Sequence, residues 1–372
     1  MLLLTPGPTP VPEAIRVAMS TPTIHHRTPE FEAVFAHARV ALKKLFGMDE
    51  VLMLASSGTG AMEASVLNLC HSKALVVNSG KFGERFGKIC AAYNKPFVEI
   101  KNEWDTPVSV DAVLELVKND PSIDAICVQI CESAGGLRHP VEALAKAAKA
   151  IRPTIMVIAD GITAVGVEKV DTTHMDALIS GSQKALMLPP GLAFVGLSSQ
   201  ALKRIEEGGV GYYFNLQTEL KNQRKNTTAW TATTTLIIGL NSMFELIEKE
   251  GGLDTLYRDT AKRAQASNKA LQALNLRIYP KVTAPSMSAV LDEDASKIRK
   301  ILKTKYGVNI AGGQDHIKET LFRINHMGLI SVYETAWALN AIELALEELG
   351  RRAYDGTANR IFTQAFYEQG IQ

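Results

Sequence analysis

The chain has 372 residues, of which 46% are apolar and 21% are charged, a composition typical of a globular protein and not of a disordered one. Its 40 basic residues balance 39 acidic ones, which argues against a nucleic-acid-binding face, because such a face needs clustered positive charge. No apolar run reaches the roughly 18 residues needed to span a bilayer. The opening MLLL is too short for a signal-peptide core, so we expect a cytoplasmic protein with no membrane partner.

Between residues 50 and 200, short apolar or β-branched runs alternate with amphipathic stretches. This alternation predicts strand–helix–strand units that form a mostly parallel sheet with helices on both faces. The ligand site of such a sheet lies beyond the carboxyl ends of its strands. We expect seven strands, at residues 51–55, 74–78, 97–100, 125–130, 155–159, 177–180 and 192–198. Helices are expected at residues 61–69, 84–93, 109–118 and 141–151.

After residue 200 the pattern changes to longer helices and shorter strands. A Thr-rich segment, residues 226–235, leads into a helical stretch at 233–275 that is interrupted at Gly251 and Gly252. Further strands are expected near residues 276–279, 287–291 and 320–325, with helices at 294–305 and 331–349. The predicted fold class is α/β, with a large domain built on the seven-stranded sheet and a smaller C-terminal α+β domain.

The cysteines are few and lie mostly in apolar segments, at Cys70, Cys90, Cys127 and Cys131. Cys127 and Cys131 fall in a run that is predicted to be a strand, and no Cys/His pair lies nearby in the sequence to complete a zinc site. We therefore expect buried free thiols and no metal ion.

Lys184 is the single charged residue in the stretch SGSQKALMLPPG at 180–191. A predicted buried strand precedes it, and two prolines and a glycine follow, which prevents a helix there. A lysine in such a place is costly to keep charged unless the charge reaches water. Its amine therefore either extends to solvent or serves as a nucleophile.

The stretch SSGTGAMEA at 56–64 is a Gly-rich turn between a predicted strand and a predicted helix. Such a turn is either a plain tight turn or an anion site suited to phosphate, because its backbone amides and the helix dipole favour negative charge. It is not a dinucleotide fingerprint, since Glu63 stands where that motif needs a small residue. A nicotinamide-dependent dehydrogenase is therefore disfavoured.

Three more residues stand out. Asp160 closes the strand IMVIAD, where it either caps the next helix or holds a cationic ring nitrogen, an attraction of about 5 kcal/mol at ~3 Å with an effective dielectric of ~20. Phe82, in NSGKFGER, is either a core residue or a ring that stacks on a flat cofactor. Arg323, within the apolar LFRINH, pairs with a neighbouring acid or binds a substrate carboxylate.

Together, a phosphate cradle, a ring-nitrogen partner, a stacking aromatic, a lysine and a carboxylate clamp suit pyridoxal 5'-phosphate. This cofactor forms a Schiff base with a lysine, and its pyridinium needs an acidic partner.

The sequence resembles the class V aminotransferases of the pyridoxal-phosphate fold-type I group, close to alanine–glyoxylate and serine–pyruvate aminotransferases. The resemblance covers essentially the whole chain, with its motifs in the family's order. They are TPGPTPVP at 5–12, HRTPEF at 26–31, SGTGAMEA at 57–64, SGKFGER at 79–85 and SGSQKALMLPPG at 180–191.

The resemblance implies a role for each candidate residue. Lys184 would be the Schiff-base lysine and the general base, Asp160 the partner of the pyridinium nitrogen, and Phe82 the ring that stacks on the cofactor. The other implied cofactor contacts are Ser57, Gly58, Thr59 and Gln183 at the phosphate and Ser133 at the phenolic oxygen.

The resemblance also implies a homodimer with shared active sites, because Thr231 falls where relatives reach the phosphate bound by the neighbouring subunit. Arg323 would bind the substrate α-carboxylate. The expected division is an N-terminal segment, residues 1–20, that packs near the active site and the small domain, then a large domain, 21–250, and a small domain, 251–372.

Two departures from the family pattern bear on the substrate. The family often has hydroxyl residues where this chain has Ala134 and Gly135, in ESAGG at 132–136, so this loop lacks two hydroxyl groups that could contact a substrate. His25 stands where relatives commonly have glycine, and it either alters substrate choice or faces solvent.

The expected activity is ping-pong transfer of an amino group from alanine or serine to glyoxylate or pyruvate. The resemblance mostly implies this preference for small substrates, and the lack of an evident second basic clamp agrees with it, although ureidoglycine, aminoethylphosphonate and phosphoserine remain open. One alternative is a lyase such as a cysteine desulfurase, which needs a catalytic cysteine in the second half of the chain, whereas all four cysteines precede residue 132. The other is a non-catalytic partner subunit of a redox complex.

Overall fold

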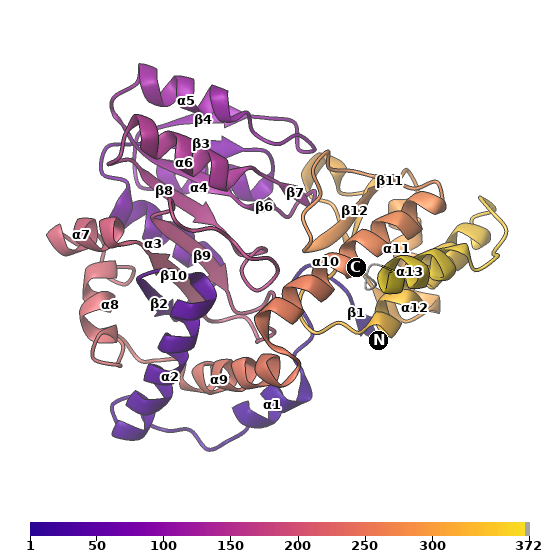
Figure 1. Ribbon diagram of the computed structural model, residues 1–372, viewed down its shortest axis with the longest axis horizontal. Coiled ribbons are helices and arrows are strands. Elements are labelled where there is room, and N and C mark those ends of the chain that lie inside the picture. Colours follow the sequence, from indigo (N-terminus) through magenta and orange to yellow (C-terminus); the bar gives the residue numbers. More distant parts are fainter. Residues whose placement is uncertain (369–372) are drawn as a thin grey trace.

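A seven-stranded sheet forms the centre of the larger part of the molecule (Figure 1). The computed structural model describes residues 1–368. In the order of the sheet, the strands are β2 (Glu50–Leu54), β10 (Ala193–Leu197), β9 (Ala177–Gly181), β8 (Met156–Asp160), β5 (Ile123–Gln129), β3 (Lys73–Asn78) and β4 (Phe97–Lys101). β10 is antiparallel to both its neighbours, and the other pairings are parallel. All seven predicted strands are confirmed, each end lying within two residues of the prediction.

Helices cover both faces of the sheet, as predicted. Successive side chains of a strand point to opposite faces, so that Leu75 and Val77 of β3 enter one core while Ala74 and Val76 enter the other. The first core is covered by α2 (Pro29–Phe46), α5 (Val110–Asn119), α6 (Val141–Ile151) and α9 (Thr234–Lys249), the second by α3 (Gly58–Leu69), α4 (Lys81–Ala92), α7 (Ser199–Glu207) and α8 (Leu216–Gln223). Of these, α2, α7 and α8 were not predicted, nor was α1 (Glu13–Met19).

The smaller part is a four-stranded sheet in the order β11 (Arg277–Ile278), β12 (Met287–Leu291), β15 (Leu321–Asn325) and β14 (Ala311–Gly312). It packs with α10 (Gly252–Ala273), α11 (Ala295–Lys305), α12 (Val332–Glu348) and α13 (Thr357–Glu368) around one core. The predicted break at Gly251 and Gly252 is confirmed, because α9 ends and α10 begins there. α13 was not predicted.

The first residues of the chain join the smaller part. β1 (Leu2–Leu3) pairs in parallel with β13 (Val308–Asn309), and Figure 1 shows the N-terminus beside α12. The chain then passes along the larger part into α1, which packs against α9. The two parts are thus joined by the N-terminal segment as well as by the link between α9 and α10.

The four cysteines are buried free thiols, as predicted. Within residues 1–368, none of the helices is long and apolar enough to cross a bilayer.

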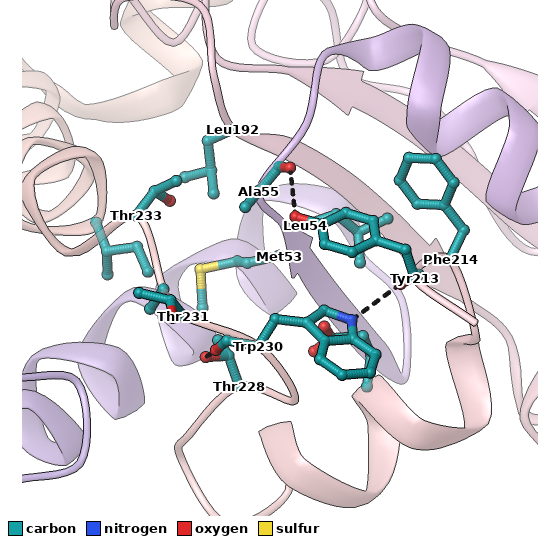
Figure 2. A pocket seen from close by; sticks show the side chains of 13 residues that line it. Met53, Leu54, Ala55, Leu192, Tyr213, Phe214, Thr228, Trp230, Thr231 and Thr233 are labelled. Atoms are coloured by element: carbon teal, nitrogen blue, oxygen red, sulfur yellow. Dashed lines mark hydrogen bonds between the residues drawn. The ribbon is translucent and has the colours of Figure 1, made fainter.

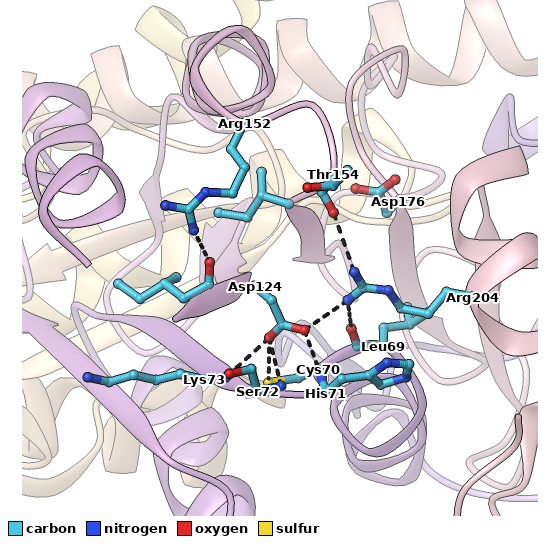
Figure 3. Close-up of polar contacts among 12 residues, drawn as sticks. Leu69, Cys70, His71, Ser72, Lys73, Asp124, Arg152, Thr154, Asp176 and Arg204 are labelled. Atoms are coloured by element: carbon cyan, nitrogen blue, oxygen red, sulfur yellow. Dashed lines mark hydrogen bonds and ion pairs between the residues drawn. The ribbon is translucent and has the colours of Figure 1, made fainter. Parts of the chain in front are cut away.

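Charged side chains at the amino-terminal edge of the large sheet are paired, and Figure 3 shows the partners of Asp124. Asp124, near the start of β5, accepts a hydrogen bond from Arg204 Nη1 at 3.0 Å and from the backbone amide of His71 at 2.9 Å. Asp176, just before β9, pairs with Lys149 at 2.6 Å. These partners offset the desolvation of the carboxylates, so this edge of the sheet is a structural one.

Candidate active site

Five segments meet at the opposite, carboxyl-terminal edge of the sheet. Because β2, β3, β5, β8 and β9 point the same way, the turns that follow them share this edge. The turns carry Ser57, Gly58, Thr59, Phe82, Ser133, Asp160, Gln183 and Lys184. The topology therefore gathers eight of the ten predicted site residues, and Arg323 approaches from the smaller part.

The loop that carries Lys184 is pinned at its base by Ser182. The Ser182 hydroxyl donates to the carbonyl of Pro189 at 2.7 Å and accepts from the Leu192 amide at 3.2 Å. These bonds fold the loop back on itself directly after β9, so Lys184 is held at the sheet edge. The predicted irregular loop is confirmed.

The N-terminal segment covers the Lys184 amine. Lys184 Nζ donates to the Pro6 carbonyl, and the Thr9 hydroxyl donates to the Lys184 carbonyl at 2.7 Å. A side chain at Gly7 would collide with the Lys184 amine, so glycine is needed there for the segment to lie this close. Taken as a whole, the Lys184 residue is half-buried.

Protein atoms crowd the ammonium group of Lys184 and exclude water from it. This desolvation, together with the positive charge of Arg323, lowers the pKa of Lys184 to about 8, although the negative charge of Asp160 opposes the change. An amine with a pKa near 8 is neutral in roughly a tenth of molecules at pH 7. The neutral amine is the nucleophilic and basic form.

Replacing Lys184 with methionine is expected to raise the free energy of unfolding of the cofactor-free chain by about 2 kcal/mol at pH 7. The folded pKa is about 8 and the usual one is 10.5, so the unfolded chain binds more protons between these values and wild-type stability rises with pH across that window. The advantage of the variant is therefore full below pH 8 and lost above 10.5.

Denaturant titrations of wild type and variant at several pH values measure this difference. Lys149→Met is the matched control, because it leaves Asp176 without its partner and should lower stability. A Lys184→Met chain less stable than wild type at pH 7 would contradict the assigned desolvation.

Asp160 is a buried carboxylate without an ion pair among residues 1–368. It is 5% exposed and accepts a hydrogen bond from the Ile162 amide at 2.9 Å. Burial raises the pKa of Asp160 to about 6, although the nearby charges of Arg85 and Lys184 oppose the rise. Asp176, equally buried, has a lysine for this purpose. Asp160 is thus suited to pairing with a cation that a ligand brings, such as a pyridinium.

The N-terminus of α3 has the form of a phosphate cradle. Ser57 occupies the N-cap position but its side chain makes no capping hydrogen bond, which leaves the first helical amides available to an anion. The turn packs closely here, since a Cβ at Gly58 would overlap with the end of the Ile162 side chain. Gln183 Oε1 and the Gly58 amide both lie within 4 Å of the place that a Cβ on Gly181 would occupy, and this buried Oε1 has no hydrogen-bond partner in residues 1–368. These residues fit a phosphate group.

Arg85 joins two of the predicted site residues and was not predicted itself. Its guanidinium lies 4.6 Å from the centroid of the Phe82 ring, and its Nη1 donates to the Thr59 hydroxyl at 2.9 Å. Phe82 and Arg85 are three residues apart on α4, a spacing that places both on one side of a helix. That spacing is the signal by which Arg85 could have been found.

Arg323 reaches the large sheet from β15. It is 7% exposed, its Nε donates to the Gly312 carbonyl at 2.8 Å, and its Nη1 donates to the Ser133 carbonyl. Burial lowers the pKa of Arg323 to about 10, which still leaves the guanidinium charged at neutral pH. The structure therefore brings Arg323 to Ser133 and into the electrostatic environment of Lys184.

The departure at Gly135 has a steric reason. A side chain at this position would stand 2.7 Å from the ring of Tyr279, which comes from the smaller part. Glycine at 135 therefore leaves room for the Tyr279 ring, which a side chain at this position would displace. His25 is exposed.

Thr231 is exposed and lines a different pocket, together with Trp230, Tyr213 and Ala55 (Figure 2). Trp230 Nε1 donates to the Tyr213 carbonyl at 3.1 Å, and the two rings stack 6.0 Å apart. The volume of this pocket is about 10 Å³, room for no more than one water. It is therefore no substrate site within a single chain.

Comparisons with known proteins point to one family. The model of the family described as "Aminotransferase class-V" matches residues 15–333. An "Uncharacterized aminotransferase" of Helicobacter pylori is 54% identical over 99% of this chain and 100% of that protein. The "Soluble hydrogenase, small subunit" of a Synechococcus strain is 35% identical over 94% of each chain.

Two relatives carry substrate names. The "Serine--glyoxylate aminotransferase" of Hyphomicrobium methylovorum is 30% identical, over 94% of this chain and 90% of its own. The crystal structure of an aspartate aminotransferase of subgroup IV from Thermus thermophilus is 31% identical, with a TM-score of 0.87 over 94% of this chain and 99% of that one. The predicted fold of the pyridoxal-phosphate-dependent fold-type I enzymes is confirmed, and the chain belongs to the class-V aminotransferase family.

Proposed function

We propose that this aminotransferase uses pyridoxal phosphate to move the amino group of alanine or serine to glyoxylate or pyruvate by a ping-pong mechanism. The observation that carries the proposal is the Lys184 amine, whose pKa is lowered to about 8 beside the charges of Asp160 and Arg323. These three groups supply a base, a partner for a ring cation and a partner for a carboxylate.

Pyridoxal phosphate would supply an aldehyde that condenses with amines and a ring that takes up the electrons of a broken Cα–H bond. Its phosphate would lie against the amides of Gly58 and Thr59, with Ser57 and Gln183 beside them. Asp160 would pair with the ring nitrogen, Phe82 would lie against the ring, and Ser133 would reach the phenolic oxygen. The uncapped start of α3 and the unpaired Asp160 support this placement.

The chain's own residues then bind the substrate and move one proton. Arg323 would hold the α-carboxylate, which gains about 1.5–3 kcal/mol from a charge-assisted hydrogen bond. The neutral form of Lys184 would accept the proton from the substrate Cα and return it to a neighbouring atom. Pro6 and Thr9 keep the lysine under cover, which limits the access of bulk water.

A small donor is supported by the placement of Arg299, a second guanidinium whose charge acts on Arg323. Arg299 packs against Gly312, where an added side chain would lie 2.7 Å from it. Gly312 pairs with Phe322, and cross-strand partners share a face. Phe322 points into the core of the smaller part, so Arg299 lies on the face opposite Arg323. It does not supply a second carboxylate clamp.

A homodimer is supported by the exposed segment around Thr231. Tyr212 is 80% exposed although its ring packs 4.9 Å from that of Trp230, and such an aromatic surface suits burial by a second copy. Thr231 would then complete the partner's phosphate site. We place the enzyme in the cytoplasm, as its sequence predicts.

The first test is the absorption spectrum of the purified protein, alone and with alanine, serine or aspartate added singly. A near-visible band that one donor removes, and that returns on adding glyoxylate or pyruvate, is the expected result. Aspartate is included because of the name of the Thermus relative. No band, even with excess pyridoxal phosphate, would contradict the proposal and favour the partner-subunit alternative.

The lyase alternative predicts release of sulfur from cysteine by a protein thiol. All four thiols are buried, and burial raises the pKa of Cys90 and of Cys131 to about 11. Thiols of that kind are poor nucleophiles at neutral pH. A sulfide assay with cysteine as substrate, run beside the spectral titration, distinguishes the two activities.

A further inference from the structure

Glu132 is a fully buried carboxylate at the carboxyl-terminal edge of the large sheet. It ends β6 (Cys131–Glu132), which pairs with β7 (Leu137–Arg138) and closes the turn at 133–136. A carboxylate without access to water is costly unless hydrogen bonds or charges stabilise it. The partners of Glu132 therefore indicate what it does.

One carboxylate oxygen of Glu132 holds the start of α4. Its Oε2 accepts from the amides of Phe82 at 3.0 Å and Gly83 at 2.9 Å. The N-cap residue of α4 is Gly80, which has no side chain to cap the helix. Glu132 supplies that cap from another segment, and its charge suits the positive end of the helix dipole.

Gly80 is the residue that admits the Glu132 side chain. A Cβ at position 80 would stand 2.5 Å from both Cγ and Cδ of Glu132. A side chain there would displace the carboxylate from the amides of α4. Gly80, the first glycine of SGKFGER, thus leaves the space that the Glu132 side chain occupies.

The other oxygen of Glu132 holds the turn that meets Arg323. Its Oε1 accepts from the Ala134 amide at 3.0 Å, and its backbone carbonyl accepts from the Gly136 amide at 3.0 Å. Ser133 lies between Glu132 and Ala134 in the chain, and its carbonyl accepts from Arg323 Nη1. The Glu132 carboxylate therefore contacts both the start of α4, which carries Phe82, and the turn at 133–136, which Arg323 contacts.

We propose that Glu132 is a positioning residue that fixes the Phe82 turn and the Ser133–Arg323 contact relative to each other, and so sets the distance between the cofactor ring and the bound substrate carboxylate. This rests on the proposed function of the site. Glu132 touches neither ligand and acts through Phe82 and Arg323.

The electrostatic surroundings of Glu132 agree with this role. Burial raises the pKa of Glu132 to about 7, and Asp160 adds to the rise, while the three amides oppose it. In turn, the charge of Glu132 favours the charged form of Arg323. The ionised carboxylate has acceptor sites for all three amides.

Glu132→Gln tests the proposal because it keeps the size of the side chain. Its amide group would face one of the three backbone N–H groups with another donor. We expect the dissociation constant for pyridoxal phosphate and the KM for the amino donor each to rise about tenfold, as the loss of a hydrogen bond to a charged group predicts. Hydrogen exchange in the cofactor-free chain should accelerate in both 80–84 and 133–136.

Glu343→Gln is the matched control. Glu343 is also fully buried on α12 and caps α13 through the amides of Thr357 at 3.2 Å and Ala358 at 2.9 Å. It should lower Tm and leave both binding constants unchanged.

Two results overturn the proposal. One is a Glu132→Gln enzyme with a lower Tm but an unchanged dissociation constant for pyridoxal phosphate and an unchanged KM for the amino donor. Glu132 would then serve only as a helix cap. The other is faster exchange in only one of the two segments. If the wild type takes up no pyridoxal phosphate, the proposed function fails, and the exchange data still decide whether Glu132 links the two segments.

Discussion

Replacing Lys184 with alanine is expected to reduce kcat for transamination at least about 1,000-fold, because the chain loses both its amine nucleophile and its base. The near-visible absorption band of the holoenzyme should shift or disappear. At the same time the cofactor-free variant should be more stable than wild type at pH 7, since a desolvated ammonium group is removed. Lost activity together with gained stability cannot be explained by misfolding.

Two controls make this result specific to the Lys184 amine. Lys149→Met removes another lysine that is largely buried, at the opposite edge of the sheet, and should keep its kcat in the fraction that remains folded. Adding a small primary amine to Lys184→Ala should restore part of the proton transfer. A Lys184→Ala enzyme that retains a tenth of wild-type kcat would contradict the role of Lys184.

The central sheet could be predicted because its buried strands are short apolar runs that end in polar or glycine residues. β8 ends at Asp160 and β9 at Gly181, and parallel pairing alone then brings their carboxyl ends together. α2 was missed although its signals are present. Thr28 caps it, Pro29 begins it, and the buried residues Phe31, Phe35, Ala38, Leu42 and Phe46 follow helical spacing.

Other features could not be predicted, because they depend on contacts between distant segments. The two-residue strand β1 is too short to show a period. Pro6 lies 178 residues from Lys184, whose amine it binds, and Glu132 lies 50 residues from Phe82. Arg85 looks like any other helical arginine until its contact with Thr59, 26 residues away, is known. Motifs therefore identified the residues of the site, and the fold identified those that hold them in place.

Replacing Asp160 with asparagine is expected to reduce kcat about 100- to 1,000-fold, because the ring nitrogen would lose an ionic partner worth up to about 5 kcal/mol. The stability of the cofactor-free chain should change in the opposite direction. The pKa of Asp160 is about 6 in the folded chain and 3.8 in the unfolded chain. Between these pH values the folded chain therefore binds more protons than the unfolded chain. Its stability falls as pH rises through that window.

The asparagine variant avoids this penalty, and it should be about 2 kcal/mol more stable than wild type at pH 7. The gain should vanish below pH 3.8. Unfolding titrations across pH and steady-state kinetics measure the two effects separately.

Asp176→Asn is the control for the expected fall in kcat and rise in stability of Asp160→Asn. Asp176 is as buried as Asp160 and directly precedes β9 of the same sheet, but it pairs with Lys149 and accepts from the Val157 amide at 2.8 Å. Its replacement should lower stability and leave kcat of the folded enzyme unchanged. If Asp160→Asn behaved in that way, Asp160 would be a turn-capping residue for Ile162. Opposite changes in stability and kcat at two equally buried aspartates would instead show that the two edges of the sheet have different roles. The amino-terminal edge, with Asp176, would maintain the fold, and the carboxyl-terminal edge, with Asp160, would perform the chemistry.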